Sequence, residues 1–375
     1  MQITNVNFAL GGMNVQTWDP PPPPPSTYLW SWGRNAYGPL GLGNTTYYSS
    51  PKQIGALTSW SNISGGFWTS IAIKTDGTLW SWGKNNLGWL GLSDTTNRSS
   101  PVQVGALTNW LSVASGVYHS KAIKTDGTLW AWGRNSYGRL GLGNTTNQSS
   151  PVQVGAGTTW SIISGGYDHS LAIKTDGTMW SWGLNFNGQL GLANSTNYSS
   201  PVQIGSLTTW STISGGDYHN LAIKTDGTLW SWGKNDNVGR LGLGDTTQRN
   251  SPVQVGALTN WLNVSAGQYH STAIKTDGTM WSWGQNSYGR LGLGDTTNRS
   301  SPVQVGALTT WLKLSAGVYG FTAIKTDGTL WAIGRGNYGQ LGLGDTTNRS
   351  SPVQVGALTT WVNISGKGAY TLAIG

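Results

Sequence analysis

The feature that most constrains this chain is an internal repeat that recurs seven times. The motif LWSWG and its variants recur every 50 residues, with one step of 51. Its first tryptophan stands at Trp30, Trp80, Trp130, Trp180, Trp230, Trp281 and Trp331. A proline in SPVQVG and a further tryptophan, first at Trp60, keep the same period. Repeats this regular form one continuous architecture, so the 375 residues need not divide into two or three independent domains.

Each unit predicts four short strands, which the second copy illustrates. We expect strands over Trp60–Ser64, Ser70–Lys74, Leu79–Gly83 and Pro101–Val104. The Asp-Gly of the TDGT segment favours a tight hairpin turn between the second and third strands. The chain has 56 Gly and 23 Trp but no Glu, a composition that suits strands better than helices. Four-stranded units of this length pack radially. The expected fold is therefore all-β, a closed seven-bladed β-propeller with four-stranded blades.

The ends of the chain predict how the propeller closes. The first repeat begins at Tyr28–Trp30, within a third strand, and the last stops at Leu372–Gly375, within a second strand. We expect the N-terminal strand to pair with the C-terminal strand in one blade. That pairing removes two open sheet edges, which would otherwise invite aggregation.

The first 25 residues differ in character from the propeller, which we assign to residues 26–375. Residues 20–25 are six consecutive prolines and predict a stiff polyproline linker. Residues 1–19 are interpreted as an anchor segment that packs on another structural chain; a flexible tail is the alternative. The proposed anchor side chains are Ile3, Val6, Phe8, Leu10 and Trp18.

The charge balance is basic, with 22 Lys+Arg against 14 acidic residues and a formal net charge of +8. The basic residues are spread along the repeats, so we interpret them as a solvated surface and expect no nucleic-acid partner. No apolar run approaches the roughly 18 residues of a membrane span. We therefore expect no membrane insertion. The chain has no cysteine, which leaves the redox compartment open.

Strand direction assigns the loops to two opposite faces. One face repeats the TDGT turn almost unchanged, which indicates a structural role. On the other face the copies differ, in the residues after the Gly-Gly pair and in the NxxGxLG loop. The candidate binding residues there are Tyr37, Phe67, Trp68, Trp89, Tyr118, Tyr137, Tyr167, Asp168, Phe186, Asp217, Tyr218, Tyr269, Tyr288, Tyr319 and Tyr338, and the loops also vary at Leu87, Arg139, Asp236 and Arg290. Tyrosine, tryptophan and arginine dominate binding hot spots; simple drift of loop tips is the alternative.

Catalytic groups are scarce. The chain has no Glu, and hydrolysis by paired carboxylates needs two acids with separated pKa values. Four histidines, His119, His169, His219 and His270, occupy one repeat position that holds Thr, Gly or Tyr in the other copies. We interpret that position as a packing or hydrogen-bonding site. No calcium loop and no phosphate loop occurs in the sequence. We expect no enzyme activity, no cofactor and no metal.

The unit GGxxHSLAIKTDGTLWSWGxNxxGxLGLGDTT…SPVQV resembles the repeat of the regulator of chromosome condensation family over residues 26–375. The resemblance implies the propeller fold, but its members differ in function: a nucleotide exchange factor for a small GTPase, the plant ultraviolet-B photoreceptor, and a bacterial inhibitor of β-lactamases that grips its target through the post-glycine pairs. Here only one residue is inserted, within Asn235–Val238, and residues 1–25 contain no Lys or Arg. Both facts depart from the exchange factor. The photoreceptor has Trp-Arg motifs at the post-glycine positions, and in this chain only Trp68 matches them.

Two functions are compatible with these patterns. The first is a non-enzymatic recognition or structural module, as a virion appendage (phage fibre or decoration) or a microbial surface protein. It would bind a protein or a glycan through the variable face and would be located on a virion or outside the cell. The alternative is an intracellular, cytoplasmic protein-binding regulator resembling a small-GTPase nucleotide exchange factor.

Overall fold

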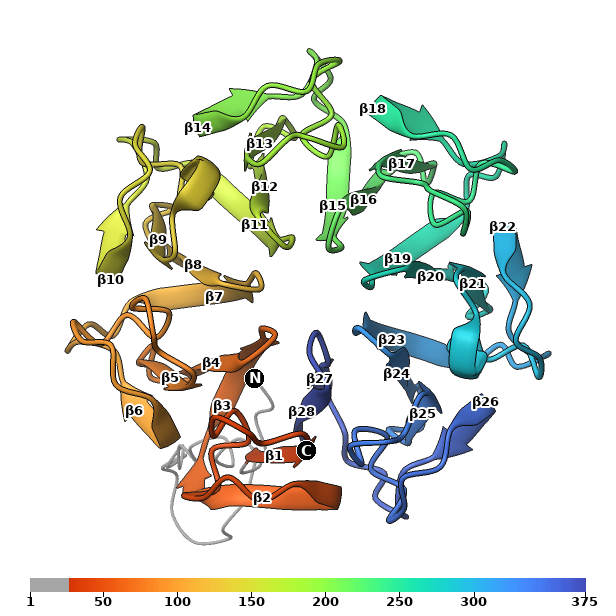
Figure 1. Ribbon diagram of the computed structural model, residues 1–375, viewed down its shortest axis with the longest axis horizontal. Helices are drawn as coiled ribbons and strands as arrows, with labels where there is room; N and C mark the ends of the chain where they lie inside the picture. Colours follow the sequence, from red (N-terminus) through yellow and green to blue (C-terminus); the bar gives the residue numbers. More distant parts are fainter. Residues whose placement is uncertain (1–26) are drawn as a thin grey trace, which may run out of the picture.

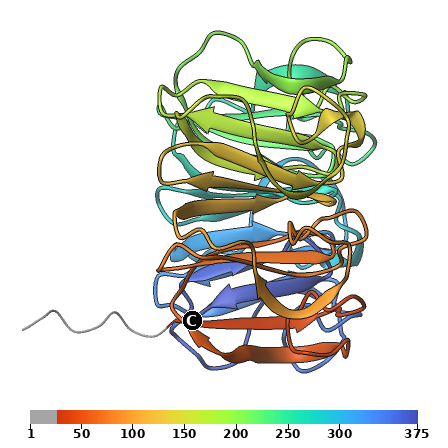
Figure 2. The same cartoon turned by 90° about the vertical axis from the view of Figure 1, so that its left-hand side faces the viewer.

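The repeats fold into seven four-stranded antiparallel sheets around a central channel, in a computed structural model that describes residues 27–375 (Figure 1). From the channel outward, the second repeat contributes β3 (Trp60–Gly65), β4 (Thr69–Lys74), β5 (Leu79–Gly83) and β6 (Arg98–Gln103). The strands run between the two faces of the molecule (Figure 2). The predicted seven-bladed propeller is confirmed.

The next five blades keep this order of strands. They comprise β7 (Trp110–Ser115), β8 (His119–Lys124), β9 (Leu129–Gly133), β10 (Gln148–Gln153); β11 (Trp160–Gly165), β12 (His169–Lys174), β13 (Met179–Gly183), β14 (Tyr198–Gln203); β15 (Trp210–Gly215), β16 (His219–Lys224), β17 (Leu229–Gly233), β18 (Arg249–Gln254); β19 (Trp261–Ala266), β20 (His270–Lys275), β21 (Met280–Gly284), β22 (Arg299–Gln304); and β23 (Trp311–Ala316), β24 (Gly320–Lys325), β25 (Leu330–Gly334), β26 (Arg349–Gln354). Two short 3₁₀ helices, η1 (Ser136–Gly138) and η2 (Ser287–Gly289), lie in loops between third and fourth strands.

The seventh blade joins the two ends of the described chain, as predicted. Its order is β27 (Asn363–Ser365), β28 (Tyr370–Ile374), β1 (Tyr28–Gly33) and β2 (Tyr48–Thr58). β1 and β28 pair antiparallel over five residue pairs. This pairing leaves neither strand with an open edge, so the propeller is closed.

The core lies between neighbouring blades and is built mainly from the recurring tryptophans, as expected from the sequence. Trp60 and Trp82 are buried, and their ring centroids lie 6.4 Å apart in an edge-to-face contact. The indole Nε1 of Trp82 donates a hydrogen bond of 2.8 Å to the carbonyl of Pro39 in the preceding blade. Trp82 therefore both fills the wedge between two blades and helps to fix their relative position.

One blade departs from this pattern without losing its packing. In the second repeat Trp82 lies opposite the small Ser70, whereas in the sixth blade Phe321 lies opposite Ile333. Both Phe321 and Ile333 are buried. In this blade the aromatic ring of the pair is on the second strand instead of the third, and an aliphatic side chain takes the place of the tryptophan.

The start of the fourth strand is the one strand boundary that was predicted wrongly by more than one residue. We expected it to begin at Pro101, but β6 already begins at Arg98, with a bulge in its pairing to β5. The strand is the outer edge of its sheet, so the missing N–H of the proline costs no ladder hydrogen bond and the proline sits inside the strand.

The TDGT turns form one face of the propeller and are structural. Asp76 Oδ1 accepts hydrogen bonds from the Thr78 backbone N (2.9 Å) and from Thr78 Oγ1 (2.6 Å). Thr78 Oγ1 in turn accepts one from Trp80 Nε1 at 2.9 Å. These hydrogen bonds are repeated in five further copies.

Both ends of the described chain lie on this same face, where the Tyr28 N–H donates to the Gly375 carbonyl at 3.0 Å. Figure 2 shows the C-terminus on the side away from the long loops. The anchor predicted for residues 1–19 and the polyproline linker of residues 20–25 lie outside the described residues. Within residues 27–375 no helix is long and apolar enough to cross a membrane.

Candidate functional site

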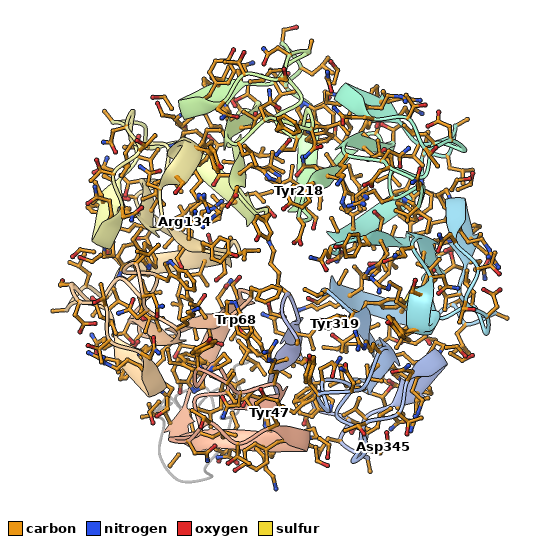
Figure 3. The ribbon with its side chains drawn as sticks, in the orientation of Figure 1. Tyr47, Trp68, Arg134, Tyr218, Tyr319 and Asp345 are labelled. Atoms are coloured by element: carbon orange, nitrogen blue, oxygen red, sulfur yellow. The ribbon has the colours of Figure 1, made fainter. Side chains whose placement is uncertain are left out.

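The candidate binding residues come together on the face opposite the TDGT turns. We call it the aromatic face. It is formed in each blade by the loop between the first two strands and the loop between the last two. Figure 3 shows Trp68, Tyr218 and Tyr319 around the mouth of the central channel, with Arg134 and Tyr47 further out.

The candidate residues differ in how much surface they offer. Four aromatic side chains expose between 36% and 77% of their surface: Tyr37, Tyr137, Phe186 and Tyr288. Eight more are half-buried, namely Phe67, Trp68, Tyr118, Tyr167, Tyr218, Tyr269, Tyr319 and Tyr338. Trp89, Asp168 and Asp217 are buried, so they support the surface rather than form part of it.

Many of the aromatic side chains hold one another in place. The hydroxyls of Tyr118 and Tyr167 lie 2.9 Å apart, and the rings of Tyr167 and Tyr218 stack with centroids 5.2 Å apart. Tyr137 and Tyr288 have positive φ values of 66° and 65°, a backbone conformation that costs a non-glycine residue on the order of 1 kcal/mol. The contacts among Tyr118, Tyr167 and Tyr218 therefore hold these three rings in place before a partner binds.

The basic residues of this face were not recognised from the sequence as a group. The position directly after LWSWG is basic in five of the seven copies, at Arg34, Lys84, Arg134, Lys234 and Arg335. This periodic position was the available signal. The residue enters the loop after the third strand, so every copy brings its charge to the aromatic face.

The expectation that positive charge is spread over the surface is wrong. Elsewhere in the described chain most charges cancel. On the TDGT face each turn has a lysine two residues before its aspartate, and four Arg–Asp pairs lie 2.5–2.6 Å apart near the outer strands. The aromatic face carries nine basic residues and three acidic ones: Arg34, Lys84, Arg134, Arg139, Lys234, Arg240, Arg290, Arg335 and Lys367, with Asp168, Asp217 and Asp236. The excess charge of the propeller is thus concentrated on one face.

Two of the three carboxylates of this face form ion pairs with basic neighbours, and the third lies within the electrostatic influence of Lys367. Asp168 is paired with Arg139, and burial raises the pKa of Asp168 although Arg139 opposes that shift. Asp236 bridges Lys234 at 3.0 Å and Arg240 at 2.5 Å. Burial raises the pKa of Asp217 to about 6, with Lys367 as the largest opposing influence.

The central channel is lined by small residues and is crossed by one lysine. A cavity of about 200 Å³ is bordered by the serines at the ends of the inner strands and by Lys367. Lys367 Nζ donates to the carbonyls of Ser115 (3.2 Å) and Gly215 (3.4 Å), which belong to two other blades. Burial lowers the pKa of Lys367 to about 8, although Asp217 opposes the shift.

Three of the four histidines form hydrogen bonds between blades, and His270 packs against Phe321 with ring centroids 6.3 Å apart, so the position serves hydrogen bonding or packing as predicted. His169 Nε2 lies 2.7 Å from Asn220 Oδ1, and His119 and His219 make the corresponding contacts to Ser170 and Ser271. Burial lowers the pKa of His169 to about 3, so its imidazole is neutral. Among residues 27–375 no group of three potential metal-ligating side chains is present.

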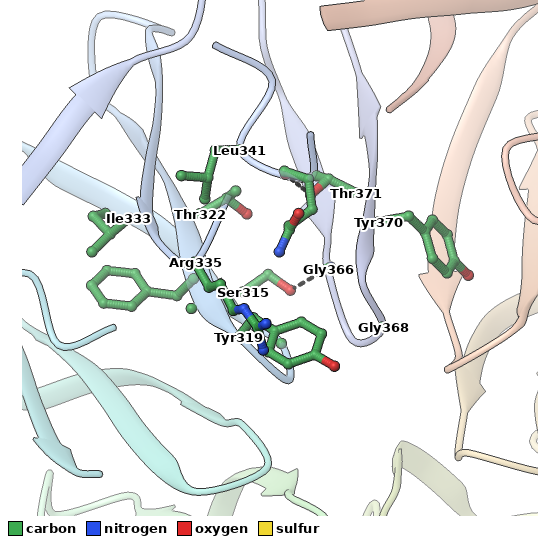
Figure 4. A pocket seen from close by; sticks show the side chains of 14 residues that line it. Ser315, Tyr319, Thr322, Ile333, Arg335, Leu341, Gly366, Gly368, Tyr370 and Thr371 are labelled. Carbon is green, nitrogen blue, oxygen red and sulfur yellow. Dashed lines mark hydrogen bonds between the residues drawn. The ribbon is translucent and has the colours of Figure 1, made fainter. Parts of the chain in front are cut away.

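A small pocket lies between the sixth and seventh blades at the edge of this face (Figure 4). Its volume is about 20 Å³, enough for a single water molecule. Tyr319 and Arg335 lie side by side at its border, with the guanidinium carbon 5.2 Å from the ring centroid. Gly320, which occupies the position that holds histidine in four other copies, is one of the residues that line this pocket.

These features define a closed seven-bladed propeller with a structural turn face and a variable, basic aromatic face. The model of the regulator of chromosome condensation (RCC1) repeat matches seven segments: residues 28–73, 76–123, 126–173, 176–223, 226–274, 277–324 and 327–374. The chain belongs to the RCC1 repeat family. A second model of the same repeat matches five segments between residues 60 and 290.

Solved structures with this fold include human WBSCR16, which has a TM-score of 0.84 and 20% identity over 93% of this chain and 98% of that one. Prp20p of Saccharomyces cerevisiae, described with its binding to Gsp1p and histones, has a TM-score of 0.82 and 21% identity over 93% and 91% of the two chains. A structure of Kap60 bound to yeast RCC1 (Prp20) gives a TM-score of 0.82 at 20% identity, over 93% and 89%. These similarities show the fold. A search of curated proteins gave no match.

Proposed function

We propose that this chain is a non-enzymatic protein-recognition module that holds its partner against the aromatic face. One observation carries the proposal. Seven copies that agree nearly everywhere else place their differing aromatic and basic residues on one face, while the opposite face repeats a single turn. Variation confined to one face of a rigid scaffold is typical of a binding surface.

The chemistry of the face supports protein binding. Tyrosine, tryptophan and arginine offer large contact areas, and each can also form hydrogen bonds. The contacts among Tyr118, Tyr167 and Tyr218 fix the side chains in advance, which reduces the entropy lost on binding. The buried carboxylates and the neutral histidines are committed to contacts within the propeller, and this supports a role without catalysis.

The comparisons support one biological setting better than the other. Membership of the RCC1 repeat family and the likeness to Prp20p, which binds Gsp1p and histones, favour an intracellular protein-binding regulator. They favour it over the virion appendage or microbial surface protein that the sequence patterns placed first. The protein partner remains part of the proposal in either setting; a glycan ligand has no support from the comparisons.

Binding measurements with purified Gsp1p and with core histones test this proposal. The variant carries Tyr37→Ser, Tyr137→Ser, Phe186→Ser and Tyr288→Ser, which removes the four exposed rings among the candidate residues. A matched control replaces four exposed leucines of the opposite face by serine, at Leu107, Leu207, Leu258 and Leu308. We expect the affinity of the aromatic-face variant to fall by about tenfold or more, with little change in the control.

Release of labelled GDP from Gsp1p, measured with the same three proteins, would show whether binding extends to nucleotide exchange. Unchanged affinity of the aromatic-face variant, or an equal loss in both variants, would contradict the proposed surface.

A further inference from the structure

Four basic side chains of the aromatic face lie in four consecutive blades and lack acidic partners. Arg335, Arg34, Lys84 and Arg134 follow β25, β1, β5 and β9, and all four are half-buried. Within residues 27–375 no carboxylate oxygen lies within 4.0 Å of their nitrogen atoms. We call this group the basic arc. The three carboxylates of the face belong to the two blades that follow Arg134 around the propeller, built from β11–β14 and β15–β18.

Aromatic rings connect the members of the basic arc into one strip. The Arg34 guanidinium carbon lies 4.5 Å from the Trp68 ring centroid and 5.0 Å from that of Tyr338. Lys84 Nζ lies 5.9 Å from the Trp68 ring and 5.4 Å from the Trp89 ring. Every neighbouring pair in the strip is in contact, in the order Tyr288, Arg335, Tyr319, Tyr338, Arg34, Trp68, Lys84, Trp89, Tyr118 and Arg134.

This packing orients the cations but provides no direct ion pair for them. A ring face attracts a guanidinium or ammonium group through its quadrupole and does not neutralise it. An arginine that lies over a ring keeps in-plane N–H donors that can pair with a carboxylate. Several such cations along one strip raise the local positive potential and attract an acidic ligand.

We propose that the basic arc binds an acidic segment of the partner protein, whose Asp and Glu carboxylates pair with Arg335, Arg34, Lys84 and Arg134. The inference rests on the proposed protein-recognition function and adds the chemistry of the partner. A second copy of the chain is disfavoured because two identical basic faces repel each other. Single-stranded nucleic acid needs open aromatic faces for base stacking, whereas the cations of the arc already lie over these rings.

The test measures binding of the full chain to three fluorescent probes: a peptide that alternates Glu and Ser, a peptide that alternates Gln and Ser, and oligo(dT). The arc variant carries Arg34→Gln, Lys84→Gln, Arg134→Gln and Arg335→Gln. The control removes the same number of positive charges from the paired arginines near the outer strands, at Arg98, Arg249, Arg299 and Arg349. Circular dichroism and thermal unfolding check that both variants fold.

We expect the Glu-Ser peptide to bind, the Gln-Ser peptide not to bind, and the arc variant to lose affinity by about tenfold or more, since each exposed charged contact contributes a factor of a few. The control should retain its affinity, and binding should weaken as salt shortens the screening length. The inference is overturned by absent binding of the Glu-Ser peptide, by unchanged affinity of the arc variant, or by preferential binding of oligo(dT).

The two proposals can fail separately. A protein partner that is lost by the aromatic-face variant but kept by the arc variant would refute the acidic segment and leave the recognition surface standing. A partner that both variants retain would refute both.

Discussion

Individual residues that depart from the repeat show what a position tolerates, because the other copies act as internal controls. Lys121 is fully buried where other copies have leucine, as at Leu171 and Leu221. Its Nζ donates to Ser170 Oγ (2.7 Å) and to the Ser164 carbonyl (2.9 Å). Burial, with a smaller effect of Lys367, lowers the pKa of Lys121 well below 10.5. The charged form is therefore disfavoured inside the propeller.

The substitution Lys121→Leu should stabilise the fold. Because the pKa of Lys121 is lower in the folded chain, the proton binds more tightly in the unfolded chain. The charge on Lys121 therefore destabilises the fold at neutral pH. This destabilisation disappears as the pH approaches 10.5, where the unfolded chain also loses the proton. We expect the free energy of unfolding to rise by roughly 1–3 kcal/mol near neutral pH. Leucine fits at this position, because other blades already carry it there. Urea unfolding at neutral and alkaline pH measures it. The exposed control Lys52→Leu should change little, and a loss of stability in Lys121→Leu would refute the argument.

Asp217 offers a second test at the residue scale, with the opposite dependence on pH. Its pKa is raised to about 6 by burial, so the folded chain binds a proton that the unfolded chain releases near pH 4. Stability therefore falls as pH rises between those values. Asp217→Asn should remove this loss and be more stable above pH 6 by about 1–3 kcal/mol. Thermal or urea unfolding across this pH range should show a difference that grows with pH; a constant difference would contradict it.

At the scale of elements, the inner strands are linked by a serine that recurs near the end of six of them. Ser64 Oγ accepts from the Ser115 N–H at 2.9 Å, and Ser214 Oγ accepts from the Ala266 N–H at 3.0 Å. Four further serines make the same contact with the next blade. Ala114 occupies this position in β7. The series of contacts between inner strands therefore lacks one member, between β7 and β11.

The substitution Ala114→Ser should supply the missing contact, to the backbone N–H of Gly165. We expect a gain of about 0.5–1.5 kcal/mol, the usual net value of an intramolecular hydrogen bond. Ser214→Ala should cost a similar amount. Chemical denaturation of both variants checks the prediction, and a destabilised Ala114→Ser together with a neutral Ser214→Ala would refute it.

Strands and hairpins could be predicted from the sequence because their signals are local. The TDGT turn and the alternating residues of LWSWG act within a few positions, and β5 has the predicted bounds, Leu79–Gly83. The start of β6 was misplaced because proline is excluded from inner strands but tolerated at a free edge. Which strand lies at the edge depends on the arrangement of the whole sheet.

At the scale of the whole molecule, closure of the propeller depends on residues more than 300 positions apart. Trp32 lies opposite Thr371 in the paired strands, and the Tyr370 hydroxyl donates to the Thr69 carbonyl at 2.6 Å in the next blade. The pairing of β1 with β28 thus holds the seventh blade together, and Tyr370 links this blade to the next one.

Deletion of residues 370–375 should open the propeller. The loss of β28 separates β27 from β1 and exposes two sheet edges, which favours aggregation. We expect loss of cooperative thermal unfolding and a shift to large species in size-exclusion chromatography. Tyr370→Phe removes only the hydroxyl contacts to the next blade and should cost about 1 kcal/mol. A monomeric, cooperatively folding deletion variant would show that the ring does not depend on this pairing.

The repeat, its strands and the sites of variation follow from the chain itself, because period, alternation and turn chemistry act between residues close in sequence. The candidate aromatic positions could be found in this way. The sequence could not show that Trp89, Asp168 and Asp217 are buried, because burial depends on which loops the closed propeller brings together. It could not show the basic arc for the same reason, since tertiary packing decides which charges pair and which stay unpaired. Arg34 meets Tyr338 only because β1 pairs with β28. Long-range packing thus decides where the excess positive charge is displayed.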